Sequence, residues 1–228
     1  GIGMINIDNV QDGIKEMERC KKLGMVGIGI PVFNHRLRYN SPVFEPLWDA
    51  AEDLDLPISL HINTNRPQDH EEFGLAGVAV APLFFVAGDY WPKLSLADMI
   101  LSGVFDRHPK MRVSVVEYEI AWAANFIQRL DYHYDQSSAG LGGYRFKNDM
   151  MPSDFFHKHC FIGGMEDALG IRLRDIIGTD NIMWGNDYPH MESTFPKSQE
   201  FLSSILADCS EDEKRKISGG NAIRVYNL

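Results

Sequence analysis

The sequence predicts an α/β protein built on a parallel sheet. Strand-like and helix-like segments alternate five times along the chain, behind a short strand-like segment at its start. The segment Met25–Val32 is a continuous apolar run, which is typical of a strand covered on both faces. Alternation of this kind indicates parallel strands joined by helices. Composition does not change along the chain and no internal repeat occurs, so we expect a single domain over residues 1–228.

The first half of the chain supplies two strand–helix units after the strand-like residues 1–7. Apolar residues at helical spacing predict a helix that begins at Asp8 or Asn9 and ends at Gly24. The apolar run at residues 25–32 predicts the next strand. Ser41-Pro42 marks the start of a second helix, because proline is favoured in a first helical turn. Residues 58–62 predict the strand that follows.

The second half of the chain continues the alternation. We expect a helix near residues 94–105, a strand at 111–117 and a helix at 120–135. Residues 136–151 are polar and glycine-rich, which indicates a long surface loop. The remaining predicted elements are a helix at 153–159, a strand at 160–162, a helix at 166–177, a strand ending at Asp187, and helices near 198–207 and 211–217.

Composition excludes several classes of function. The formal net charge of −10 argues against a nucleic acid or an anionic membrane as partner, since either selects clustered Lys and Arg. The three cysteines are far apart and form no CxxC pair, so reduced thiols are expected. The longest apolar run, residues 75–88, is too short to span a bilayer, and residues 1–8 lack a basic signal region. These features predict a cytoplasmic protein that acts on a small molecule.

Three candidate site residues stand at the ends of predicted strands. Because the carboxyl ends of parallel strands lie at one edge of a sheet, His61, Glu117 and Asp187 are expected to lie near one another. Imidazole and carboxylate groups bind divalent zinc, manganese or iron. Water bound to such a metal loses a proton near neutral pH, and Asp187 would both ligate the metal and accept that proton.

Each of these residues also has a structural explanation. A lone histidine at a strand end is more often structural than a ligand, Asp187 before Tyr-Pro suits a turn, and Glu117 suits a helix cap. Three such residues at equivalent strand ends favour a site, because independent structural needs do not place them at one edge. Arg66, in the polar loop after His61, is a candidate for binding a substrate carboxylate, with an exposed role as its alternative.

Four segments together resemble one known family. They are residues 56–61 (LPISLH), 108–113 (HPKMRV), 183–190 (MWGNDYPH) and 219–226 (GGNAIRVY). In this order they resemble the amidohydrolase-related (amidohydrolase 2) group of the amidohydrolase superfamily. That group includes carboxymuconate-semialdehyde and resorcylate decarboxylases as well as hydrolases of related carbonyl compounds.

The resemblance implies a (β/α)₈ TIM barrel of the metal-dependent hydrolase type, with the site at the carboxyl ends of its strands. The chain resembles the C-terminal two-thirds of such a barrel, with the first two strands missing. The resemblance makes His61 and Asp187 metal ligands, with zinc the first choice and manganese or iron as alternatives. It places Trp184 and His190 beside the substrate. A sheet lacking two strands exposes its edges, so we also expect self-association into a homo-oligomer.

The resemblance leaves three functions open. The family's decarboxylases carry a catalytic histidine where this chain has Glu117, which favours hydrolysis over decarboxylation. The first expectation is therefore a metal-dependent hydrolase that acts on a small carbonyl or carboxylated substrate, aromatic substrates included. The alternatives are a non-oxidative decarboxylase of an aromatic or muconate-type acid, and a non-catalytic barrel fragment or one part of a split enzyme.

Overall fold

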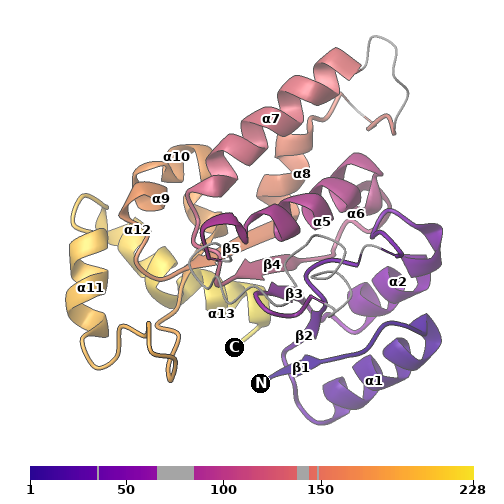
Figure 1. The fold of residues 1–228 in the computed structure, drawn as a ribbon, viewed down its shortest axis with the longest axis horizontal. Coiled ribbons are helices and arrows are strands. Elements are labelled where there is room, and N and C mark those ends of the chain that lie inside the picture. Colours follow the sequence, from indigo (N-terminus) through magenta and orange to yellow (C-terminus); the bar gives the residue numbers. More distant parts are fainter. Residues whose placement is uncertain (35, 66–84, 138–143, 148) are drawn as a thin grey trace.

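The computed structural model describes residues 1–34, 36–65, 85–137, 144–147 and 149–228. At its centre is a six-stranded sheet in which the strands lie side by side in sequence order (Figure 1). The strands are β1 (Ile2–Met4), β2 (Gly27–Ile30), β3 (Ile58–His61), β4 (Val113–Val116), β5 (Cys160–Gly164) and β6 (Ile182–Trp184). Every neighbouring pair is parallel, which confirms the predicted α/β class.

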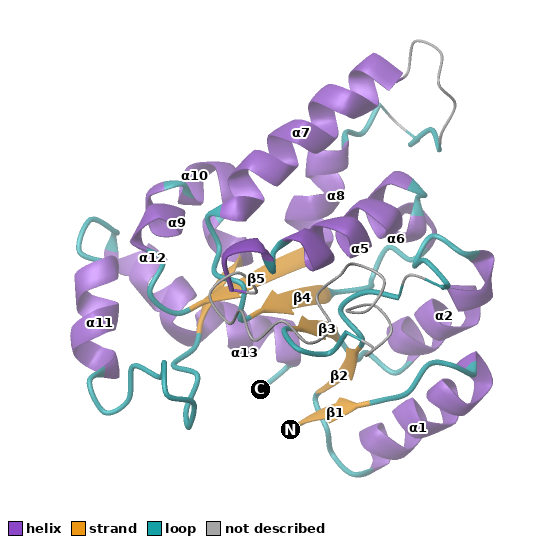
Figure 2. Cartoon of the chain, in the orientation of Figure 1, coloured by secondary structure: helices purple, strands orange, loops and turns teal. Residues whose placement is uncertain are grey.

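Helices join the strands and cover the sheet (Figure 2). Those before β4 are α1 (Val10–Lys22), the 3₁₀ turn η1 (Pro42–Phe44), α2 (Glu45–Asp53), α5 (Tyr90–Leu101) and α6 (Val104–Arg107). Those between β4 and β6 are α7 (Trp122–Ser137), α8 (Pro152–His159), α9 (Ala168–Arg172), α10 (Arg174–Ile177) and the 3₁₀ turn η2 (Thr179–Asn181). Those after β6 are α11 (Ser198–Ile205), α12 (Glu211–Arg215), η3 (Lys216–Gly220) and α13 (Asn221–Tyr226).

The predicted helix boundaries hold where the sequence carries a capping residue. The Asn9 side chain accepts hydrogen bonds from the backbone N–H groups of Gln11 and Asp12, so it begins α1 as expected. Gly24 follows the end of that helix with a φ of 79°, a conformation that glycine adopts without strain. Ser41 likewise caps η1, which leads directly into α2.

The structure differs from the predicted elements at several points. The helix expected at 94–105 is two helices, because Gly103 takes a left-handed φ of 74° between α5 and α6. The helix expected at 166–177 divides at Leu173 into α9 and α10. The strand expected to end at Asp187 ends at Trp184, and residues 221–226, which were matched only as a family motif, form α13.

The core lies on both faces of the sheet. Alternate strand residues such as Ile58, Val113 and Ile162 belong to the large cluster that the surrounding helices bury. A smaller cluster of Phe161, Met183, Val225 and Tyr226 joins α13 to β5 and β6. Among the described helices, none is both long and apolar enough to cross a membrane.

The Tyr226 hydroxyl attaches α13 to the middle of the sheet. It lies 3.1 Å from Ser59 Oγ on β3 and 2.7 Å from Ser114 Oγ on β4, and the two serine hydroxyls are 2.7 Å apart. Buried hydroxyls need such partners, because an unpaired polar group in the core is costly. Ser59 precedes His61 by two residues, so this network lies directly beneath the carboxyl end of β3.

Candidate active site

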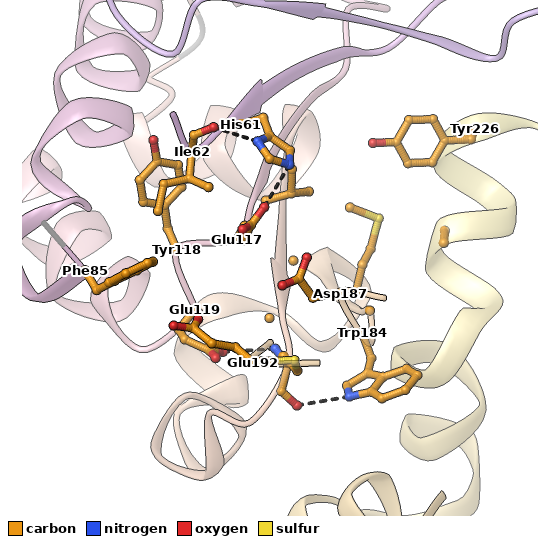
Figure 3. A pocket seen from close by; sticks show the side chains of 17 residues that line it. His61, Ile62, Phe85, Glu117, Tyr118, Glu119, Trp184, Asp187, Glu192 and Tyr226 are labelled. Carbon is orange, nitrogen blue, oxygen red and sulfur yellow. Dashed lines mark hydrogen bonds and ion pairs between the residues drawn. The ribbon is translucent and has the colours of Figure 1, made fainter. Parts of the chain in front are cut away.

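A cavity of about 570 Å³ lies at the carboxyl ends of β3 to β6. Its size falls within the range of small-molecule sites, roughly 300–1,000 Å³. His61 ends β3, Glu117 follows β4 and Asp187 follows β6, and all three line the cavity with their side chains directed toward one another (Figure 3). The structure therefore brings together the three strand-end residues that the sequence singled out.

Both nitrogens of His61 have partners. The Nδ1 atom lies 2.7 Å from the backbone carbonyl oxygen of Ile62, which fixes Nδ1 as the N–H donor. The Nε2 atom faces the cavity and lies 2.8 Å from Oε2 of Glu117. A backbone carbonyl on one ring nitrogen is the usual support of a metal-binding histidine, because it orients the other nitrogen toward the ion.

Asp187 and Glu117 meet at a second histidine, His190. The Nδ1 atom of His190 lies 2.8 and 2.9 Å from the two carboxylate oxygens of Asp187, and 3.6 Å from Oε1 of Glu117. One ligand atom from each of Glu117, Asp187 and His190 can be chosen so that all lie within 4.8 Å of one another. Two carboxylates and an imidazole are a donor set that suits a divalent transition metal, so these residues fit a metal ion.

The electrostatics of the site follow from burial and from the crowding of like charges. Burial raises the pKa of Glu117, and the neighbouring Asp187 charge raises it further, while His61 and His190 oppose the rise. The hydrogen bond to Asp187 raises the pKa of His190, and the Glu117 charge adds to the rise. Glu117 is thus more readily protonated than an ordinary glutamate, which suits a group that carries a proton.

The backbone turns sharply where these carboxylates leave the sheet. Glu117 and Asp187 have left-handed φ values of 66° and 55°, and Asn63 beyond β3 has 59°. This conformation costs a non-glycine residue on the order of 1 kcal/mol. Residues held in it cluster at functional sites, where the fold imposes a direction on a side chain.

The predicted substrate-binding residues occupy different positions. Trp184 lines the cavity, and its indole N–H donates to the carbonyl oxygen of Met165 at 3.0 Å, so its polar edge is already used. His190 is exposed and its Nδ1 faces Asp187, which makes it a candidate ligand as well as a substrate contact. Arg66 lies outside the described residues.

Two further acidic residues, Glu119 and Glu192, line the cavity and were not singled out from the sequence. Burial raises the pKa of Glu119, against the lowering effect of two backbone N–H groups, those of Met165 and Glu166. The alternation Glu117-Tyr118-Glu119 is a signal that sequence reasoning passed over. Among the described lining residues, four are acidic and none is Lys or Arg, so the cavity is strongly electronegative.

Known proteins similar to this chain include several decarboxylases. The γ-resorcylate decarboxylase of Rhizobium sp. (strain MTP-10005) is 25% identical over 227 residues, which cover 94% of this chain and 65% of that protein. The 5-carboxyvanillate decarboxylase from Sphingomonas paucimobilis has a similar structure, with a TM-score of 0.81 and 25% identity over 100% of this chain and 66% of that one. The chain thus spans a little under two-thirds of these relatives.

A second similar structure carries a metal. It is the 5-carboxyvanillate decarboxylase from Novosphingobium aromaticivorans with bound manganese, with a TM-score of 0.79 and 21% identity over 100% of this chain and 65% of that one. This likeness shows the shared fold. Together with the six parallel strands, it supports the predicted relation to the (β/α)₈ barrels.

The expectation of a hydrolase is wrong, because the γ-resorcylate, carboxymuconate-semialdehyde and 5-carboxyvanillate enzymes that this chain resembles are decarboxylases. The physical reason is that hydrolysis and decarboxylation use the same strand-end imidazoles and carboxylates, so these residues do not discriminate between them. The weight placed on glutamate rather than histidine at position 117 was also misplaced. The half-buried Glu117, whose pKa burial raises, is a carboxyl group that can donate a proton to carbon as well as accept one.

The family itself is shown along the whole chain. The family model described as Amidohydrolase matches residues 2–228, in agreement with the resemblance of the four sequence segments. The chain therefore belongs to the amidohydrolase family.

Proposed function

We propose that this chain carries the metal and proton site of a non-oxidative decarboxylase that acts on a hydroxylated aromatic acid. The observation that carries the proposal is the convergence of His61, Glu117 and Asp187 in one cavity at the strand ends, with the exposed His190 bonded to Asp187. The decarboxylase relatives support the choice of reaction. The proposal also includes one domain over residues 1–228 and self-association.

The cavity's charge supports a bound cation. Four carboxylates without a described Lys or Arg repel an anionic substrate, and a divalent metal offsets that repulsion. In the proposal, Asp187 and His190 hold the metal together with His61, whose Nε2 lies beside Glu117, and Glu117, the third member of the close group, is assigned to the proton instead. Manganese is the first candidate because solved decarboxylases of this fold contain it. Zinc, the first choice from the sequence, and iron are the alternatives. When bound, the metal supplies a positive charge that attracts the oxygens of the substrate.

The chain's own residues then account for the proton. Loss of CO₂ breaks the bond between the ring carbon and the carboxylate, and a proton takes the place of the CO₂ on that carbon. Glu117 is the proposed proton donor, because burial raises its pKa and its carboxyl group lies in the cavity. Asp187 and His190 hold each other in place through their hydrogen bonds. Trp184 supplies an apolar ring to the wall beside the substrate.

The test is product analysis with the Mn²⁺-loaded chain and two acids, 2,6-dihydroxybenzoate and 5-carboxyvanillate. We expect equal amounts of CO₂ and the decarboxylated phenol. Glu117→Gln should lower turnover by about 100-fold or more at saturating Mn²⁺, because general acid catalysis contributes about 10²–10⁴-fold. A chain that binds Mn²⁺ and decarboxylates neither acid would contradict the proposal for these substrates.

A further inference from the structure

Two loops at the site exchange hydrogen bonds in both directions. From the loop after β4, the Glu119 carboxylate accepts the backbone N–H groups of Met165 at 3.0 Å and of Glu166 at 3.3 Å. From the loop after β5, the Asp167 carboxylate accepts those of Ile120 at 2.9 Å and Ala121 at 2.6 Å. Hydrogen bonds from N–H groups to a carboxylate are among the stronger ones in proteins. We call this pair of interactions the Glu119–Asp167 clamp.

Two tryptophans extend the clamp to the neighbouring elements. The Trp122 indole N–H, at the start of α7, donates to the carbonyl oxygen of Glu119 at 3.0 Å. The Trp184 indole N–H, at the end of β6, donates to the carbonyl oxygen of Met165 at 3.0 Å. The loops after β4 and β5 and the end of β6 are therefore joined by one continuous set of hydrogen bonds.

The clamp crosses a strand whose carboxyl end carries no side chains. β5 lies between β4 and β6 and ends in Gly163 and Gly164, which carry no side chains. A Cβ atom added at Gly164 would lie 2.9 Å from Oε2 of Glu119, so glycine leaves the space that the carboxylate needs. Glu117 stands before this strand and Asp187 after it, so their separation depends on how the three strand ends are held.

The geometry points to Glu119 and Asp167 as positioning residues that fix Glu117 and Asp187 relative to each other across β5. Glu117 precedes Glu119 by two residues, and both have left-handed φ values, of 66° and 53°. Asp187 follows Trp184 by three residues, and Trp184 is bonded to the clamped Met165. This inference rests on the metal and proton site proposed above, and it assigns the support of that site to two residues that are neither its proposed metal ligands nor its proton donor.

The test compares Glu119→Gln with Glu166→Gln in the full chain. Both changes replace a carboxylate by an amide within the same pair of loops, but only the first removes an acceptor of the clamp, since the Glu166 side chain is exposed. Supporting partners of a metal site typically contribute about 10–100-fold to affinity or activity. We expect Glu119→Gln to bind Mn²⁺ about tenfold more weakly and to lower kcat about tenfold at saturating Mn²⁺, while KM stays within about twofold of wild type. Glu166→Gln should match wild type in Mn²⁺ affinity, kcat and KM.

Indole N–H resonances provide a readout that needs no activity. The chain has four tryptophans, two of which, Trp122 and Trp184, report on the clamp, while Trp48 and Trp91 report on the buried core. In Glu119→Gln we expect the two clamp resonances to shift and the two core resonances to stay in place, which shows that the variant is folded. The double variant Glu119→Gln/Asp167→Asn should lose less Mn²⁺ affinity than the sum of the losses in the two single variants, because both substitutions disrupt the same clamp.

The outcomes separate the clamp from the proposed reaction. If the wild-type chain binds Mn²⁺ but releases no CO₂, the proposed function fails and the Mn²⁺ comparison still decides the clamp. If Glu119→Gln matches Glu166→Gln in Mn²⁺ affinity and turnover, the positioning role is overturned even where the indole resonances move. A wild-type chain that binds no Mn²⁺ would overturn the inference as well, because no ligands are then positioned.

Discussion

Protonation of the buried His159 should destabilise the fold in acid. His159 is 1% exposed at the end of α8, its ring stacks on Phe105, and its Nδ1 lies 2.7 Å from the carbonyl oxygen of Met111. Among the residues that the structure describes, its Nε2 finds no hydrogen-bond partner. Burial lowers the pKa of His159 from 6.5 to about 4, so the folded chain resists a proton that the unfolded chain accepts.

The sign and size of the effect follow from linkage. Between pH 6.5 and about 4 the unfolded state binds more protons at His159 than the folded state does. The contribution of this histidine to the free energy of unfolding is therefore fully present above pH 6.5 and is lost as the pH falls toward about 4. At about 1.36 kcal/mol per pH unit, the whole interval corresponds to about 3 kcal/mol, and lowering the pH from about 7.5 to about 5 removes about 2 kcal/mol.

The measurement is urea unfolding of wild type and His159→Gln at those two pH values. Glutamine keeps an N–H donor for Met111 and does not titrate, so the free energy of unfolding of wild type should fall by about 2 kcal/mol more than that of the variant. His157→Gln is the matched control, since His157 is exposed two residues away, and it should keep the pH dependence of wild type. Equal pH dependence in wild type and His159→Gln would refute the reasoning.

Three further changes address the site and its support. Asp187→Asn should weaken Mn²⁺ binding by more than about tenfold in calorimetric titration, because it removes a charged ligand, and unchanged affinity would exclude Asp187 as a ligand. Tyr226→Phe should lower the free energy of unfolding by about 1–2 kcal/mol in urea, because the hydroxyl contacts two buried serine hydroxyls at 2.7 and 3.1 Å; no loss would show that these contacts add nothing. Gly164→Ala should lower turnover as Glu119→Gln does, since the added methyl meets the Glu119 carboxylate, and wild-type turnover would show that the loop accommodates it.

Much of the fold could be predicted because its signals are local. Asn9, Gly24 and Ser41 mark helix ends through their own backbone and side-chain chemistry, and strand–helix alternation gives the parallel sheet. The division of the predicted 94–105 helix was not predicted, because a helix can either continue through a glycine or end at it. Tertiary packing decides between them, and at Gly103 the left-handed conformation is the one adopted.

The sequence predicts which residues form the site, but it does not predict the hydrogen bonds that join the loops around it. His61, Glu117 and Asp187 follow from the rule that parallel strands end at one edge, and the structure places all three in one cavity. The clamp was not predictable, because Glu119 and Asp167 are 48 residues apart and each binds backbone groups, which leave no trace in the sequence. The prediction of the reaction type was wrong because the same imidazole and carboxylate side chains serve hydrolysis and decarboxylation. The two reactions differ in where the proton is delivered, which residue type does not reveal.

Deuterium incorporation tests the central claim most directly. The Mn²⁺-loaded chain is incubated with 2,6-dihydroxybenzoate in D₂O, and the phenol formed is analysed by mass spectrometry and NMR, alongside Glu117→Gln. A decarboxylase with Glu117 as proton donor predicts CO₂ and one deuterium on the carbon that lost the carboxylate, at a rate that falls about 100-fold in the variant. Equal rates in wild type and Glu117→Gln, or a product that has gained water and kept its carboxylate, would contradict it.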